Sequence, residues 1–318
     1  MPTPNRTHTA AVAAPVIALA AVGLLGMLSA PAVAGGSGGT TAGSGENGAA
    51  GPKVVGAQLA ERFLGRRALT PPPALDLKEA GRIRGAFVEH LASELGGVAG
   101  YKAALTSRPA QKRLGVDGPL WGTLFSGGLL PSGSELTPDV GIALMFEPDL
   151  MVRVGSTAIR TASTRGEALA ALDAVLPFLE LPDMPFAAGV KPGAPELVAV
   201  NAGVRAGILG EAIPLRGGEG WERRLGTFQV ELMDPDGGAL GQGRGASLMG
   251  HPLDAVLWLR DALAAEGIEL QPGQLLSLGS LAPPRPVAPD LEGIRVRYLG
   301  LAPDGAVEVS VRFAAPVR

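Results

Sequence analysis

The sequence predicts an α+β fold. Two amphipathic helical patterns come first, and short β-type runs broken by glycine and proline follow from residue 98 onward. Two tight-turn sequences, 234–238 and 302–305, each separate a pair of β-type runs, which predicts two β-hairpins. Helices followed by a largely β body with long loops are typical of the α+β class.

The first helix is predicted over 54–69 and the second over 77–95, because apolar residues recur there at helical spacing. Three consecutive prolines, at 71–73, stop the first helix, and Gly96 and Gly97 end the second. Further helices are predicted over 165–176 and 252–266. Strands are predicted over 99–105, 140–146, 197–200, 227–233, 274–278, 293–298 and 306–313.

The N-terminal residues 1–34 predict an export signal that is not part of the fold. Residues 10–34 are small, apolar and uncharged, and they end in Ala32-Val33-Ala34, which is a small-x-small cleavage signature. We therefore expect an exported protein, periplasmic or secreted, with no stable membrane anchor after cleavage. The stretch is long enough to cross a bilayer, so an uncleaved anchor is the alternative.

A flexible linker is predicted over residues 35–52, which are rich in glycine and small polar residues. The folded domain is then expected to span 53–318, a length that supports a core of its own.

The composition of the chain argues against some classes of function. The chain carries 27 Lys and Arg against 30 Asp and Glu, a formal net charge of −3, and this mild acidity argues against nucleic acid as a partner. The chain has no cysteine and only three histidines, of which His8 lies in the predicted signal, so any metal must be a hard, oxygen-ligated cation.

Lys102 is the most informative single residue. It lies in an apolar, strand-like run between Tyr101 and Ala103, so its ammonium is expected to be partly buried. A buried ammonium needs a counter-charge or an anionic ligand, which indicates a binding site. Ordinary snorkelling of a strand-edge lysine is the alternative.

Two sequences near Lys102 carry a family resemblance. Residues 100–107 read GYKAALTS, and residues 115–124 read GVDGPLWGTL. Both resemble segments at the same spacing in the 2-keto-4-pentenoate hydratase family, relatives of the fumarylacetoacetate hydrolases. The resemblance extends over about 54–313 and implies a mixed β-roll or barrel-like core with helices outside.

The resemblance also implies a metal site with Mg²⁺ or Mn²⁺. In the family, a Glu-x-Glu pair at a strand and a third Glu downstream hold the cation. Placed on residues 138–146, the pair falls on Asp139 and Gly141, and the third ligand on Glu180. Since Gly141 supplies no side chain, the resemblance implies a weakened metal site.

Other positions receive roles from the same resemblance. Lys102 and Asp117 are implied as catalytic residues, although an Asp before Gly-Pro also forms turns. Asn201 and Ser280 are implied as substrate-binding residues. His251 stands at a predicted helix start, where a capping role is the expected one.

The function implied is a hydro-lyase acting on a small 2-oxo-alkenoate through an enolate. A catalytically degraded, ligand-binding member of the family is the first alternative, favoured by Gly141. A related decarboxylase or acylpyruvate hydrolase is the second. Family members are often homo-oligomers, so a homo-oligomer is also expected.

Overall fold

The computed structural model describes residues 50–216 and 220–314. The predicted signal peptide and linker residues 35–49 lie outside the described residues. Among the helices that the structure describes, none is long and apolar enough to cross a membrane.

Helices α1 (Pro52–Leu64) and α2 (Leu77–Glu94) form the predicted N-terminal pair. The Asp76 side chain caps α2 by accepting the Glu79 N–H at 2.7 Å. The two helices bury their apolar faces against each other, and the rings of Phe63 and Phe87 meet edge-on with centroids 5.5 Å apart. Both predicted helices are confirmed, although α1 ends at Leu64 because Gly65 follows.

A nine-stranded mixed sheet forms the centre of the domain, with the order β2-β1-β11-β5-β6-β7-β3 and two short strands, β12 and β8, paired to β5 and β6. Its strands are β1 (Val98–Ala104), β2 (Leu120–Phe125), β3 (Leu129–Pro131), β5 (Met145–Val154), β6 (Leu172–Leu181), β7 (Ala206–Leu209), β8 (Ile213–Pro214), β11 (Leu275–Ser280) and β12 (Arg285–Pro286).

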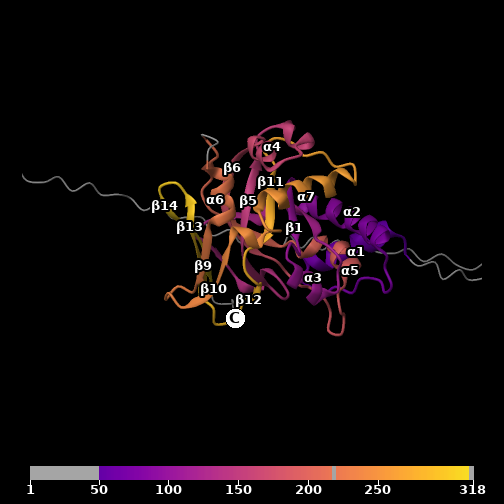
Figure 1. Cartoon of the computed structure of the whole chain (residues 1–318). Coiled ribbons are helices and arrows are strands. Elements are labelled where there is room, and N and C mark those ends of the chain that lie inside the picture. The colour runs from indigo at the N-terminus through magenta and orange to yellow at the C-terminus, as the bar shows by residue number, and fades with distance from the viewer. Residues whose placement is uncertain (1–49, 217–219, 315–318) are drawn as a thin grey trace, which may run out of the picture. The chain divides into compact units, whose positions relative to one another are not determined.

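A five-stranded sheet with the order β10-β9-β13-β14-β4 packs beside it. Its strands are β4 (Ser134–Leu136), β9 (Gln229–Met233), β10 (Ala239–Arg244), β13 (Gly293–Ala302) and β14 (Gly305–Phe313). Strands β9 and β10 are antiparallel, as are β13 and β14, so both predicted hairpins are confirmed. In Figure 1 this sheet lies at the end of the domain opposite α1, α2 and α5.

Shorter helices connect the strands: α3 (Arg108–Leu114), α4 (Arg165–Ala170), α5 (Ala194–Ala199), α6 (Trp221–Thr227) and α7 (Pro252–Ala264). Short 3₁₀ turns are η1 (Ser126–Gly128), η2 (Pro138–Val140), η3 (Thr157–Thr161), η4 (Asn201–Gly203) and η5 (Gly245–Ser247). The predicted helix over 252–266 is confirmed by α7.

Three predicted elements are wrong. Residues 140–146 were expected to form a strand, but β5 begins only at Met145. Residues 197–200 belong to helix α5 and its end, because Pro195 and Glu196 favour a helix start. The helix predicted over 165–176 stops at Ala170, and the apolar run from Leu172 becomes a strand buried on both faces.

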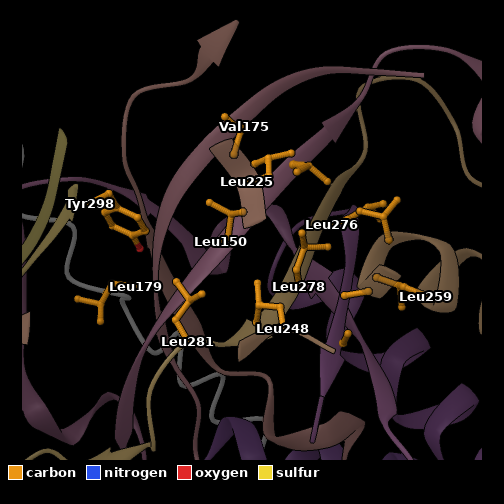
Figure 2. Packing of buried hydrophobic residues seen from close by; sticks show 14 of the residues in the cluster. Leu150, Val175, Leu179, Leu225, Leu248, Leu259, Leu276, Leu278, Leu281 and Tyr298 are labelled. Atoms are coloured by element: carbon orange, nitrogen blue, oxygen red, sulfur yellow. The ribbon is translucent and has the colours of Figure 1, made fainter. Parts of the chain in front are cut away.

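The main core lies between the two sheets. Leu150, Val152, Leu179 and Leu181 point from β5 and β6 into it, and Figure 2 shows Leu150 and Leu179 near Tyr298 of β13. Since successive side chains of a strand alternate between faces, the residues in between point to the other face of the nine-stranded sheet. That second face carries the ionisable cluster described next.

Candidate active site

Strands β5 and β6 place three acidic residues on one face of the sheet. Glu147 and Asp149 are two residues apart on β5, so both side chains leave the same face. Glu180 on β6 is the direct partner of Glu147 in the antiparallel register. Directly opposed residues of an antiparallel pair have Cβ atoms about 5 Å apart, so the pairing places two acidic groups beside each other.

Lys102 reaches this face from β1. Its ammonium donates to Glu180 Oε1, and both side chains are almost fully buried, with 3% and 2% exposed. Ser277 of β11 is the parallel partner of Lys102 and joins the same face. The burial of Lys102 expected from the sequence is therefore confirmed, and its counter-charge is Glu180.

The Asp149 carboxylate is held by three donors. It accepts the Leu150 N–H at 2.5 Å and the Leu278 N–H at 3.2 Å, and it accepts the hydroxyl of Ser277. Hydrogen bonds from main-chain amides and a hydroxyl satisfy a buried carboxylate without a second cation. Asp149 is thus the most firmly oriented of the three acids.

The charges of the cluster do not balance, because three acids share one ammonium. Burial and the neighbouring Glu180 raise the pKa of Glu147 to about 8. Burial and the Glu180 charge also raise the pKa of Asp149 well above its usual range. Burial alone would lower the pKa of Lys102, but the charges of Glu180 and Glu147 outweigh it and raise that pKa.

One edge of the cluster is less covered. Glu147 and Ser280 are both partly exposed to solvent. The exposed part of Glu147 is not its carboxyl group, which is buried. A hydrogen bond with Ser280 lowers the pKa of Glu147, against the larger effect of burial. Ser280 therefore lies beside Glu147, at the less covered edge of the cluster.

A close contact behind Ser280 requires glycine. Gly279 has φ +104°, and a Cβ there would lie 2.4 Å from Oγ1 of the buried Thr106. The loop after β1 therefore packs directly on β11 beside the cluster.

The cluster offers the donor atoms that a hard divalent cation prefers. All three acids offer oxygen, the donor that Mg²⁺ and Mn²⁺ prefer, and Glu180 Oε2 is buried without a hydrogen-bond partner among the described residues. In chemistry and burial the set fits such a cation. As arranged here, however, no three His, Asp or Glu side chains of residues 50–216 and 220–314 converge closely enough to hold an ion.

The structure does not bring Asp139 and Gly141 to the cluster, which corrects the ligand positions expected from the sequence. Asp139 lies in η2, is 61% exposed and pairs with Arg66 at 2.7 Å. A Cβ at Gly141 would lie 3.0 Å from the Asp183 carboxyl carbon, so Gly141 packs against that side chain. Residues Glu147-Pro148-Asp149 match the family's Glu-x-Glu pair better than Asp139 and Gly141 do. They also form an acid-x-acid pair, and they stand before an apolar run.

Asp117 lies in the turn between α3 and β2 and is exposed, outside the cluster. Asn201 is fully buried, and its amide accepts the Thr123 N–H at 2.7 Å and donates to the Thr123 carbonyl at 2.9 Å. Because both polar atoms of Asn201 are engaged with main chain, the residue fixes η4 to β2.

His251 caps helix α7, as expected. Its Nδ1 accepts the Leu253 N–H at 3.1 Å, and its Nε2 lies 2.9 Å from the Glu222 carbonyl oxygen. Both ring nitrogens are therefore engaged in local structure.

Known proteins share this fold. A solved 4-oxalocrotonate decarboxylase from Pseudomonas putida G7, in complex with magnesium and adipate, superposes with a TM-score of 0.72, covering 83% of this chain and 97% of that one at 24% identity. The same enzyme with calcium and acetate gives a TM-score of 0.70. The fold is thus of the fumarylacetoacetate-hydrolase-like class, as predicted.

Sequence comparison narrows the class to a family. A 2-keto-4-pentenoate hydratase from Burkholderia vietnamiensis is 33% identical over 195 residues, covering 58% of this chain and 69% of the relative. A 4-oxalocrotonate decarboxylase from Pseudomonas putida is 29% identical over 222 residues, covering 68% and 77%. No protein-family model matches the chain. The chain belongs to the 2-keto-4-pentenoate hydratase family.

Proposed function

We propose that this protein is a metal-assisted lyase acting on a small 2-oxo acid, with hydration of a 2-oxo-alkenoate as its reaction. The observation that carries the proposal is the buried set of Lys102, Glu147, Asp149 and Glu180 on one face of the central sheet. Relatives named as hydratases and as a decarboxylase support the substrate class.

The three carboxylates are the residues that would hold a divalent cation. When bound, such a cation supplies positive charge to the carboxylate and 2-oxygen of a 2-oxo acid, where negative charge develops during enolisation. Magnesium and calcium in the solved decarboxylase support this assignment.

The protein's own residues supply the proton transfers. Lys102 carries a proton on Nζ at neutral pH and stands beside Glu180, so it can orient an anionic substrate and donate to it. In the metal-free protein burial and Glu180 raise the pKa of Glu147 to about 8, so this carboxyl would have to release its proton to hold a cation. Ser277 and the Leu278 N–H keep the Asp149 carboxylate in one orientation.

Decarboxylation is the second candidate, because the same stabilisation of charge at the 2-oxygen serves loss of CO₂. A decarboxylase is among the matched relatives, and the solved structure with TM-score 0.72 is a decarboxylase. The alternative of a catalytically degraded, ligand-binding family member is less well supported, because its main argument was that Gly141 occupies a metal-ligand position.

The test is a turnover assay of the full chain with Mn²⁺. 2-Keto-4-pentenoate is supplied as its dienol and followed by loss of diene absorbance, and 4-oxalocrotonate is followed by CO₂ release. The variant Glu180→Gln is expected to lower the rate by about 10²-fold or more. The matched control Asp139→Asn, which changes an exposed carboxylate, is expected to keep the wild-type rate.

The two substrates separate the two reactions. Turnover of 4-oxalocrotonate alone would make decarboxylation the activity. No turnover of either substrate by folded, Mn²⁺-loaded wild type contradicts the lyase proposal and favours a member that binds a 2-oxo acid without converting it.

Location and assembly stay predictions. Export rests on residues 1–34, and fractionation of the producing cells with an antibody to the domain would test it. Sedimentation of the purified domain would test the expected homo-oligomer.

A further inference from the structure

The phenol of Tyr298 reaches the strand pair that carries the carboxylates from the opposite face of the sheet. Tyr298 lies on β13 of the five-stranded sheet and is fully buried. Figure 2 shows its ring beside Leu150 and Leu179, with the hydroxyl directed toward the strands. These two leucines are the chain neighbours of Asp149 and Phe178, which face each other in the β5–β6 register.

The hydroxyl contacts three main-chain groups of this residue pair. It accepts the Phe178 N–H at 3.0 Å, and its single proton lies within reach of the Asp149 carbonyl at 2.6 Å and the Phe178 carbonyl at 2.7 Å. In an antiparallel pair, such groups ordinarily bond to the facing strand. Here the hydroxyl of Tyr298, from the second sheet, also contacts these groups, at the residue that bears the Asp149 carboxylate.

Asp149 is consequently fixed from both faces of the sheet. Its carboxylate is held by Ser277 and by the Leu150 and Leu278 amides on one face, and its carbonyl is held by Tyr298 on the other. Glu147 and Glu180 lie two residues from this point along the same two strands. The spacing of all three acids therefore depends on the strand geometry at Asp149 and Phe178.

We infer that Tyr298 is a positioning residue, which sets the spacing of the three carboxylates through the main chain of β5 and β6. The inference rests on the proposed function in so far as that spacing serves a cation. Tyr298 touches neither the carboxylate side chains nor the face where a substrate would bind, so its influence passes through the two strands.

The test compares Tyr298→Phe with Phe228→Leu in the full chain. Tyr298→Phe removes the hydroxyl and keeps the ring. Phe228 stacks on the Tyr298 ring at 6.2 Å, so Phe228→Leu loosens packing around the ring and leaves the hydroxyl in place. Both variants are expected to lose thermal stability, so stability alone would not distinguish them.

The first readout is amide hydrogen exchange in peptides covering 145–154 and 172–181, without metal. Tyr298→Phe is expected to speed exchange in both segments more than Phe228→Leu does, because only the first removes the hydroxyl that accepts the Phe178 N–H. Equal exchange in the two variants would overturn the inference.

The second readout is the affinity for Mn²⁺, measured by titration. Loss of an outer contact to a ligand-bearing group weakens metal binding about 10-fold or more, so Tyr298→Phe should bind Mn²⁺ about 10-fold more weakly than Phe228→Leu. Unchanged affinity in Tyr298→Phe would overturn the positioning role even if exchange increases.

The two readouts distinguish a failure of the proposed metal-assisted function from a failure of the positioning role of Tyr298. If wild type binds no Mn²⁺, the metal proposal fails by itself, and exchange then decides the strand contact. Faster exchange confined to the two segments would support that contact, and unchanged exchange would refute it.

Discussion

Two acidic segments lie close together in the sequence and have opposite environments. Asp139 stands in an exposed turn and is neutralised by one partner, Arg66. Glu147 and Asp149 stand on a strand inside the protein and, with Glu180, share the single ammonium of Lys102. The difference shows that the fold, and not the residue type, decides whether an acidic group is neutralised by an exposed partner or held in a buried cluster with a raised pKa.

The largest expected contrast is between Lys102→Met and Arg66→Met. Removing Lys102 leaves Glu180 buried without its counter-charge, which should lower the free energy of unfolding by about 3–5 kcal/mol. Removing Arg66 breaks an exposed pair and should cost less than about 1 kcal/mol. Urea denaturation at neutral pH measures both, and similar losses would contradict the distinction between the two segments.

The second prediction concerns the pH dependence of stability in metal-free protein. The pKa of Glu147 is about 8 in the folded state against an ordinary value of 4.5, so between these limits the folded state binds more protons than the unfolded state. The free energy of unfolding should therefore fall as pH rises toward 8, by up to about 1.4 kcal/mol per pH unit for each such proton. The raised pKa of Asp149 acts in the same direction.

Denaturation with a chelator present, repeated from pH 6 to pH 9, checks this slope. Glu147→Gln should flatten it, whereas Asp139→Asn should leave it unchanged. A wild-type stability that rises over this range would show that Glu147 is not protonated in the folded protein.

A third, smaller effect is expected at Asn201. Asn201→Ala leaves the buried Thr123 N–H and carbonyl without their partners, which should cost about 1–3 kcal/mol. The loss should appear as lower thermal stability, with Mn²⁺ affinity retained because Asn201 does not touch the carboxylates. Weaker Mn²⁺ binding would instead place η4 in the site.

The smallest effect is expected at Asp117, which is exposed in its turn. Asp117→Ala should change the free energy of unfolding by no more than about 0.5 kcal/mol and should leave the turnover rate of wild type. A large drop in turnover without a change in stability would restore the catalytic role that the resemblance implied.

Much of the fold could be predicted from local sequence. Helix α2, the β9–β10 and β13–β14 turns and the strand of Lys102 all have strong local signals. The apolar run that forms β6 reads as part of a helix because both of its faces are buried, which removes the alternation that marks a strand.

Of the site residues predicted from the sequence, Lys102 and Glu180 lie in the buried cluster and Ser280 lies beside it, whereas Glu147 and Asp149 were not predicted. The error lay in the position of the strand: a strand starting near residue 140 assigns the ligands to Asp139 and Gly141, whereas β5 starts at Met145. Cross-strand pairing brings Glu147 opposite Glu180, and pairing is a long-range property that a local pattern does not contain. Tyr298 was missed for the same reason.

The parallel pairing of β1 with β11 has a kinetic consequence. Strand β1 of the early chain gains this neighbour only from a segment near the far end of the domain, with Lys102 opposite Ser277. Closing so long a loop costs entropy before the contacts compensate for it, and domains dominated by such remote pairings fold in milliseconds to seconds or more slowly. Lys102 therefore reaches its native surroundings late, and a chain still being synthesised holds β1 without that partner until β11 has emerged from the ribosome.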